Sequence, residues 1–336
     1  MTTTGSRSRT LCTALVVLST LAVAQGSRAQ EGGEPAPPAG AECCLHLLVP
    51  VGARASALGG AITARSGADA VFRNPAGLAA LSGSRFVIHH SDDTTLDVQV
   101  DAFSLLFTPF STTMGISYQL FDRGEIETTD PTGQPTGELS LRDHLLAASF
   151  ALPVGGGVSA GVNYKVFQQR IDCRGICGGA ENVATTQAVD VGLHYNPSWH
   201  PALEIGLAVV NAGLALQVIN FEQSDRFPGR IHFGVVYDLL AAVPTDNLVA
   251  LRLAVDARDK LSAPDSPTLA VGLELDVQQA VFLRAGYTPG EGLGTGAAVG
   301  LELRYDRFDI GVSRSFANSL LEADAEPFHV SLGLHF

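Results

Sequence analysis

Charged side chains are scarce in this chain of 336 residues. They make up 16% of it, against about 25% in typical soluble domains. Hydrophobic residues make up 46%. So little charge indicates an apolar environment beyond an ordinary core, and the length suits one domain behind a processed leader.

Long apolar runs and basic clusters are also missing. After the first 24 residues no stretch approaches the ~18 consecutive apolar residues of a spanning helix, which excludes a helical membrane protein. No patch of Lys and Arg occurs, and the formal net charge of -13 argues against a nucleic-acid partner. A soluble exported protein and a β-barrel remain.

Cysteine is infrequent, with five residues, and none is spaced as in a four-ligand zinc site. We therefore expect no metal and no cofactor. Cys173 and Cys177 stand in a Gly-rich stretch, where a local disulfide is favoured over free thiols. Cys43 and Cys44 are adjacent, and a bridge between neighbours is strained. The sequence leaves the pairing of these four open.

The N-terminus has the pattern of a secretory signal peptide. Arg7 and Arg9 precede an apolar run over 11–24, which ends in Ala22-Val23-Ala24. This predicts a signal peptide over 1–24, and export makes disulfides permissible. The next segment, 25–51, begins rich in Gly, Pro and Glu, and we expect it to be a flexible periplasmic lead-in.

From residue 85 onward apolar residues alternate with small or polar ones, as in half-exposed strands. In the last run one face carries Phe328, Val330, Leu332, Leu334 and Phe336. About fourteen such runs occur, an even number, and short connections alternate with long ones. The pattern predicts an all-β fold, a transmembrane antiparallel β-barrel of about 14 strands over 84–336, behind a short N-terminal plug.

The expected strands and connections can be placed along the chain. The runs begin near Arg85, Asp97, Thr112, Asp143, Gly157, Thr185, Leu203, Gly229, Leu248, Ser266, Gln279, Thr295, Arg307 and Pro327. The short connections are expected at 109–111, 153–156, 197–202, 277–278 and around Asp306, and the long ones at 122–140, 171–184, 212–228, 257–265 and 316–326.

A soluble β-sandwich also alternates apolar and polar residues. The leader, the number of strands and the terminal Phe336 favour the barrel, because a final Phe in such a strand resembles the signal read by the outer-membrane assembly machinery. We expect aromatic girdles from residues near the run ends, namely Phe107, Phe110, Phe121, Tyr195, Trp199, Tyr287, Tyr305 and Phe308.

Residues 52–83 differ from the strands and read as a plug with short helical turns. Small residues allow close backbone packing inside a barrel. Asn74 suits a helix N-cap and Pro75 the first helical position. The expected plug residues are Gly52, Arg54, Gly59, Gly60, Asp69, Asn74, Pro75, Ala76, Gly77 and Leu78.

Charged residues on the small-residue face of the strands are expected to point into the lumen. They are Lys165, Asp190, Arg252, Asp256, Glu274, Arg284, Glu302 and Arg304. A network of paired wall charges that holds the plug is favoured over a substrate path.

Several short stretches resemble the PorV/PorQ family, a branch related to the FadL-type outer-membrane transporters. The resemblance rests on the Gly-Ala-Arg-Ala step at Gly52, Leu58-Gly59-Gly60-Ala61 and Asn74-Pro75-Ala76-Gly77-Leu78. It continues through 161–165, 190–193, 210–213, 283–287 and the closing 331–336.

The resemblance implies a fourteen-stranded barrel with an N-terminal plug in the cell outer membrane. FadL relatives admit hydrophobic compounds such as long-chain fatty acids, whereas PorV serves a protein secretion system and receives cargo. The expected partners are outer-membrane lipid and the barrel assembly machinery, with hydrophobic small molecules or secreted cargo as alternatives.

An enzyme is not expected. Gly157-Val158-Ser159-Ala160-Gly161 matches the nucleophile-elbow template, but that chemistry needs a strained turn between a strand and a helix. Alternation runs straight through the motif, so we interpret it as a strand. A channel or docking barrel is the leading hypothesis. A structural barrel with a sealed lumen and a soluble exported β-protein are the alternatives.

Overall fold

The computed structural model describes residues 42–93, 98–177, 181–217, 224–243, 248–289, 296–316 and 327–336. The predicted signal peptide, 1–24, and the lead-in up to residue 41 lie outside these ranges. Within them no helix is long and apolar enough to cross a membrane.

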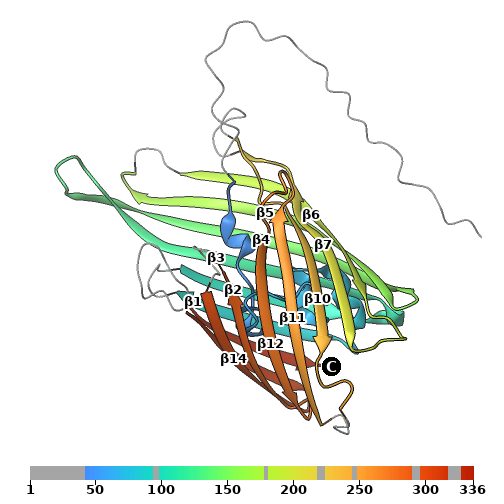
Figure 1. The fold of residues 1–336 in the computed structure, drawn as a ribbon. Helices are drawn as coiled ribbons and strands as arrows, with labels where there is room; N and C mark the ends of the chain where they lie inside the picture. The colour runs from blue at the N-terminus through green and yellow to red at the C-terminus, as the bar shows by residue number, and fades with distance from the viewer. Residues whose placement is uncertain are drawn as a thin grey trace, which may run out of the picture. The chain divides into compact units, whose positions relative to one another are not determined.

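In the described part of the chain, fourteen strands form one closed antiparallel barrel, as predicted (Figure 1). Each strand pairs with the next along the chain, except that β7 pairs with β10, and β1 closes the barrel against β16. The strands are β1 (Arg85–Asp93), β2 (Val98–Phe107), β3 (Thr113–Thr129), β4 (Pro135–Gly155), β5 (Val158–Gly175), β6 (Asn182–Tyr195), β7 (Leu203–Gly213), β10 (Arg230–Asp238), β11 (Val249–Lys260), β12 (Thr268–Val277), β13 (Val281–Thr288), β14 (Gly296–Tyr305), β15 (Phe308–Phe316) and β16 (Phe328–His335).

Two short strands stand outside the barrel wall. β8 (Leu216–Gln217) and β9 (Ser224–Asp225) pair with each other in the connection between β7 and β10. The N-terminal segment holds η1 (Leu45–Leu48), α1 (Ala53–Ala57), η2 (Ala68–Phe72) and η3 (Pro75–Ala80), and η4 (Pro109–Ser111) joins β2 to β3.

The two ends of the barrel differ. At the turn end, where β1 begins and β16 ends, connections are mostly short and use left-handed residues, such as Gln278 and Gln279 with φ of 57° and 55°. Two positive φ values are what a tight hairpin with the twist of its strands requires. Ser84 and Phe336 exchange backbone hydrogen bonds of 3.0 Å here. The opposite, loop end carries the longer connections.

The strands β3 to β6 are longer than predicted. The loops expected at 122–140 and 171–184 are largely strand, since β3 runs to Thr129, β4 starts at Pro135 and β5 runs to Gly175. The β3–β4 hairpin projects past the neighbouring strands (Figure 1). The prediction was wrong because these strand ends carry polar residues on both faces, so the alternation stops before the hydrogen bonding does.

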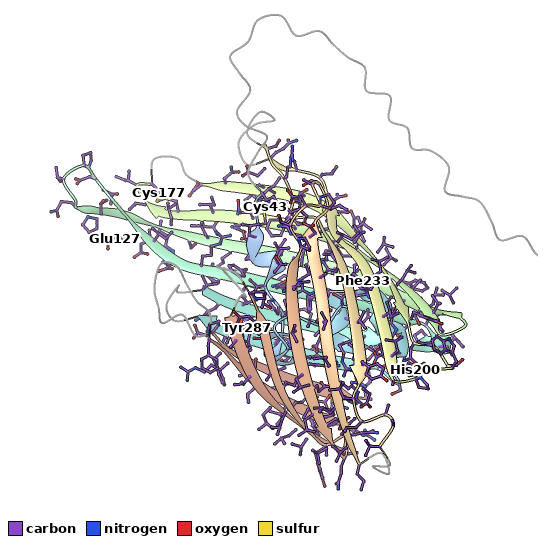
Figure 2. All side chains as sticks on the ribbon, viewed as in Figure 1. Cys43, Glu127, Cys177, His200, Phe233 and Tyr287 are labelled. Carbon is purple, nitrogen blue, oxygen red and sulfur yellow. A yellow bond between two sulfur atoms is a disulfide. The ribbon has the colours of Figure 1, made fainter. Side chains whose placement is uncertain are left out.

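The apolar faces of the strands point outward, as predicted. Phe328 and Leu332 are each 48% exposed, whereas the intervening wall position His329 is 3% exposed. Phe233 and Tyr287 lie on the outer surface in the same way (Figure 2). These side chains are not interleaved between two sheets, so a β-sandwich does not describe the fold. The exterior is an apolar surface of the kind that lipid covers.

Most of the predicted girdle aromatics are exposed near the strand ends, including Phe110, Trp199 and Tyr305. Phe121 is the exception: it is 6% exposed and points inward. Its parity explains this, because Met114 and Ile116 on the same strand face outward, so odd-numbered positions of β3 face the lumen.

Candidate functional site

The lumen is occupied by the chain between Gly52 and Leu81, which we call the plug. It contacts the wall mostly through backbone, because glycines stand where it passes. A Cβ built on any of seven wall glycines would lie within 3.0 Å of an atom of the plug. They are Gly161, Gly192, Gly206, Gly234, Gly272, Gly286 and Gly300, and they belong to β5, β6, β7, β10, β12, β13 and β14.

The plug backbone approaches the wall closely at single glycine positions. At Gly206 a Cβ would lie 2.6 Å from the carbonyl carbon of Thr63 and 2.8 Å from the Cα of Ala64. At Gly286 it would lie 2.7 Å from the carbonyl oxygen of Ala57. Backbone atoms cannot rotate away as a side chain can, so the wall requires glycine at these positions. This belt of wall glycines was not among the site residues predicted from the sequence.

The predicted plug glycines adopt backbone conformations that favour glycine. Gly52, Gly59 and Gly60 have φ of 91°, 61° and 77°, a region that other residues enter at a cost. Gly77 has an ordinary φ, but a Cβ there would lie 2.7 Å from the carbonyl oxygen of Arg65. Small residues in the plug therefore match small residues in the wall.

Asn74 links the plug to itself and to the wall. Its side-chain oxygen accepts from the Ala76 N–H at 3.2 Å, which caps η3, and Pro75 takes the first helical position. Its amide donates to the carbonyl oxygens of Thr63 at 2.7 Å and of Leu193 on β6 at 3.0 Å. Asn74 and Leu78 are fully buried, so the residues predicted as a cap also anchor the plug.

Inward charges form a paired network around Glu274, which is 2% exposed. Four guanidinium groups surround this carboxylate: those of Arg54 and Arg65 in the plug, at 3.6 and 2.5 Å, and those of Arg252 and Arg284 in the wall, at 3.3 and 2.7 Å. Plug and wall are thereby joined by charge as well as by backbone packing.

The structure places all eight predicted lumen charges on the inside of the barrel. Lys165 pairs with Asp190 at 2.7 Å, Arg284 with Glu302 at 2.8 Å and Arg304 with Asp309 at 2.8 Å, while Asp256 accepts from Thr63. In the plug, Asp69 lies 4.0 Å from Arg54 and 3.7 Å from His89. Partners that the sequence analysis missed include Thr63, Arg65, His194 and Glu204.

Two sizeable cavities lie among the described residues of the lumen, one toward each end, and they share no lining residue. The turn-end cavity has a volume of about 650 Å³ and is strongly charged. Its lining includes Arg54, Arg65, Arg85, Arg252, Arg284 and Arg304, together with Asp69, Glu204, Glu274, Asp276, Glu302 and Asp309. Equal numbers of cations and anions leave no excess charge to select one sign of solute.

The loop-end cavity has a volume of about 390 Å³ and is mainly apolar. Its apolar lining includes Leu45, Val49, Pro50, Val98, Val100, Phe121, Ala298 and Pro327. Polar groups stand at a few positions, among them His46, Arg123 and His329. This composition is typical of sites for mostly apolar ligands, in which a few polar groups fix orientation.

Residues 42–50, which we call the strap, line one side of this cavity at the loop end. Glu42 accepts two hydrogen bonds from Arg230, at 2.8 and 2.6 Å, and the Cys43 N–H donates to the Arg226 carbonyl at 3.0 Å. These hydrogen bonds lower the pKa of Glu42. Residues 42–51 thus pack against the barrel toward the loop end, where the sequence predicted part of a flexible periplasmic lead-in over 25–51.

The strap is also held by buried contacts. Cys44 packs in a cluster with Phe167, Leu216 and Phe227, and a disulfide joins it to Cys43. The His46 ring packs against the Phe121 ring, with the ring centroids 4.2 Å apart and the planes tilted by 32°. Burial and the nearby Arg123 lower the pKa of His46 to about 3, so its ring is neutral at ordinary pH.

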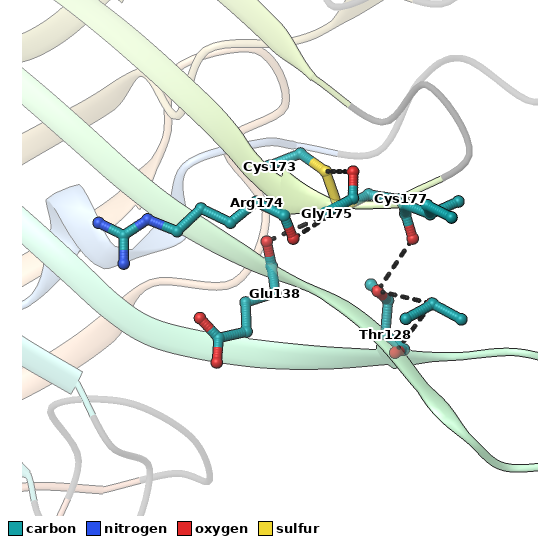
Figure 3. Close-up of a disulfide and its surroundings, with 8 residues drawn as sticks. Thr128, Glu138, Cys173, Arg174, Gly175 and Cys177 are labelled. Atoms are coloured by element: carbon teal, nitrogen blue, oxygen red, sulfur yellow. Dashed lines mark hydrogen bonds between the residues drawn. A yellow bond between two sulfur atoms is a disulfide. The ribbon is translucent and has the colours of Figure 1, made fainter.

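A second disulfide joins Cys173 and Cys177 at the outer end of β5 (Figure 3). The Ile176 N–H donates to the Thr136 carbonyl on β4 at 3.0 Å, and the Thr128 hydroxyl donates to the Ile176 carbonyl at 3.3 Å. The disulfide closes a local loop at the end of β5, and these hydrogen bonds attach that loop to β3 and β4.

The features considered for catalysis lie in regular structure. The Gly157–Gly161 motif runs into β5, with no helix after it among the described residues, so Ser159 stands on a strand. In the same part of the chain no group of three or more His, Cys, Asp or Glu residues could hold a metal ion.

Comparisons with known proteins identify a family and a fold. The model of UPF0164, an uncharacterised protein family, matches residues 19–336. A search of curated proteins gave no match. The PorV/PorQ assignment is therefore not supported by the family model that matches.

Several solved structures are similar to this chain in fold. The toluene transporter TbuX of Ralstonia pickettii has 10% identity and a TM-score of 0.57, with 85% of this chain and 98% of that chain covered. The monoaromatic hydrocarbon channel CymD has 12% identity and a TM-score of 0.58, with 86% and 98% covered. A FadL homologue of Pseudomonas aeruginosa has 11% identity and a TM-score of 0.52, with 86% and 99% covered. At such identities the likeness shows a FadL-like fold.

Proposed function

This chain belongs to the uncharacterised protein family UPF0164, and from that premise we propose that it is an outer-membrane channel for small hydrophobic solutes. The single observation that carries the proposal is the loop-end cavity of about 390 Å³, because it is mainly apolar whereas the turn-end cavity is strongly charged. Apolar cavities of about 150 Å³ hold benzene, so the loop-end cavity, which is larger, can hold a one-ring hydrocarbon.

The fold supports the same proposal. TbuX is a toluene transporter and CymD a monoaromatic hydrocarbon channel. Both have a fold similar to this barrel over 98% of their own chains. The apolar exterior fits outer-membrane lipid, the terminal Phe336 fits recognition by the barrel assembly machinery, and 1–24 fits export. In this proposal a solute enters at the loop end and binds beside Phe121, and the plug must shift before it reaches the turn-end cavity.

The solute would contact few polar groups. His46 is neutral, and Arg123 already donates to Asp143 at 2.9 Å and to the His46 ring at 3.2 Å. A charged head group would therefore have to displace an existing bond. This favours neutral aromatic or aliphatic compounds over anionic ones.

A second candidate is docking in protein export, as in PorV. The observation that favours it is the length of β3, β4 and β5, which have 17, 21 and 18 residues, while β10 to β16 have 8 to 12. These strands present a sheet beyond the loop-end cavity that an exported protein could contact.

The test is uptake of labelled toluene and of a labelled fatty acid by cells that carry the chain, against a deletion strain. Ala298→Trp fills the loop-end cavity from the inward face of β14, and we expect it to reduce uptake at least tenfold. Val299→Trp, one position along and outward-facing, is the matched control and should leave uptake unchanged.

Two results would reject the channel. Equal uptake in the wild-type and deletion strains is one, and equal uptake by the two tryptophan variants is the other. Surface-protein export in the same deletion strain tests docking, and its loss with normal uptake would favour that candidate. Anomalous gel mobility before boiling would establish a folded membrane barrel in every variant.

A further inference from the structure

Three basic side chains inside the barrel have no ion-pair partner among the described residues. Arg73 of the plug is 5% exposed, yet no described residue hydrogen-bonds it or lies within ion-pair distance. Arg258 of β11 donates to the Thr288 hydroxyl at 3.4 Å and has no ion pair. His232 of β10 is 1% exposed, and neither of its ring nitrogens has a partner.

These groups converge on one place. Arg258 Nη1 and Arg73 Nη2 lie 3.1 and 3.5 Å from the point that a Cβ on Gly60 would occupy. His232 stands directly opposite Arg258 in the β10–β11 register. Two guanidinium groups that approach the same point repel each other strongly away from bulk water, unless an anion lies between them.

The nearby carboxylate of Asp256 does not neutralise both guanidinium groups. Asp256 Oδ2 accepts from the Thr63 N–H at 2.9 Å and from its hydroxyl at 2.6 Å, and Oδ1 has no partner in the described structure. Lys165, also nearby, is matched by Asp190 at 2.7 Å. The two positive charges of Arg73 and Arg258 face the single negative charge of Asp256, so one positive charge is left in excess.

We propose that Arg73 and Arg258, with His232 beside them, form a buried binding site for one small monovalent anion of halide size. The small size follows from the surroundings, because Pro50 Cγ lies 3.1 Å from the same point beside Gly60. Burial and Arg258 lower the pKa of Arg73 to about 9, so its side chain is still charged at neutral pH.

The site joins the plug to the wall, since Arg73 belongs to the first and Arg258 to the second. A ligand that binds between them stabilises the docked plug and has no equivalent site once the plug leaves. The bound anion would therefore hold the plug in its docked position, and loss of the anion would favour release of the plug. The inference does not depend on which solute the barrel conducts.

The experiment uses the full chain in detergent at constant ionic strength. Sodium gluconate, whose anion is too large for the site, is replaced stepwise by sodium chloride or sodium bromide. The readout is the urea concentration at which trypsin begins to cleave the plug at Arg54 and Arg65. We expect this midpoint to rise and saturate with either halide.

Variants separate the site from general salt effects. Arg73→Met and Arg258→Met should each weaken the apparent halide affinity at least tenfold, and in gluconate neither should be less stable than the wild type, because an uncompensated cation is removed. Arg252→Met is the matched control: it lies on the same strand and face but is paired with Glu274 and Asp276. It should lower the midpoint and keep the halide dependence.

Crystals soaked in bromide should give an anomalous peak between Arg73 and Arg258. No halide dependence in the wild type would overturn the proposal, since water would then fill the space. Dependence that survives in the Arg73→Met, Arg258→Met double variant would overturn it as well. A response to acetate without a response to halides would reject a halide-sized site.

Discussion

The side-chain amide of Asn74 donates to the backbone carbonyl of Leu193 across 119 residues, at 3.0 Å. The acceptor belongs to β6, so a plug side chain is bonded to the backbone of the wall. Asn74 is fully buried and makes two further hydrogen bonds, to Thr63 and Ala76. The plug is therefore docked by bonds that water cannot replace while it stays in the lumen.

Asn74→Ala should release the plug more easily. It removes three hydrogen bonds and leaves buried carbonyl groups without donors, at a cost of about 1–3 kcal/mol for each group left unpaired. We expect docking to weaken by on the order of 3 kcal/mol, measured as faster trypsin cleavage at Arg65. Asn196→Ala, which loses bonds only in the turn between β6 and β7, is the control. Equal protection in the two variants would contradict the role of Asn74.

Gly206→Ala should displace the plug, because the new methyl group would overlap the backbone of Thr63 and Ala64. Overpacking of this kind costs about 1–3 kcal/mol where side chains can adjust, and more is expected here. Gly311→Ala is the matched control, since its Cβ would lie 3.4 Å from the Ala53 Cβ, at ordinary contact distance. Urea midpoints of plug release should fall for the first variant and hold for the second. Equal midpoints would count against the glycine belt.

Period-two alternation was sufficient to predict the strands of the wall and the direction of their side chains. Glu274 and Arg284 could be placed in the lumen because each stands between two apolar, outward neighbours. Phe121 shows the error that follows when parity is ignored, because it was assigned to a girdle from its position near the end of a run. Parity with Met114 and Ile116 would have placed it inside.

The plug contacts could not be predicted in the same way. Which wall glycine faces Thr63 depends on the stagger of the strands around the barrel, and no local pattern in the sequence records that stagger. The glycines themselves are a usable signal, since five of the six successive barrel strands from β6 to β13 carry one at an inward position, namely Gly192, Gly206, Gly234, Gly272 and Gly286. The place of the strap was missed because Gly- and Pro-rich sequence before residue 42 gave no indication of the packed residues that follow.

Acid should loosen the strap through His46. Its pKa in the folded chain is lowered to about 3 by burial, against an ordinary value of 6.5. The unfolded or released strap binds the proton first, so stability is full above pH 6.5 and falls as the pH drops toward 3, by ~1.4 kcal/mol per pH unit at most. Protease cleavage or hydrogen exchange at 42–50 should rise over that range.

His46→Gln should flatten this dependence, because no proton is taken up on release. The Glu42–Arg230 pair adds a second contribution in the lower part of this range, since the pKa of Glu42 is lowered and its contribution is lost only below its ordinary value of 4.5. Glu42→Gln should therefore make the fall in stability below pH 4.5 less steep and leave the part near pH 6 intact. A wild-type profile that is flat from pH 7 to 4 would contradict the role of His46.

Glu274→Gln should disturb the plug more than any other change of one wall charge to an amide. The substitution leaves Arg54, Arg65, Arg252 and Arg284 around a neutral group, and removing one partner from a buried ionic network costs about 3–5 kcal/mol. Two of these four cations belong to the plug, so their repulsion from the wall is relieved when the plug leaves. The expected result is a higher ion conductance in planar bilayers and faster cleavage of the plug.

Glu302→Gln is the matched control for that variant. Glu302 pairs with Arg284 and Arg304, which both belong to the wall, so its loss should lower barrel stability without raising conductance. If both variants conduct alike, the charge network holds the wall together but not the plug. If only Glu274→Gln raises the conductance, the ion pairs around Glu274 hold the plug in place between the two cavities. Two plug cations, Arg54 and Arg65, share this wall carboxylate.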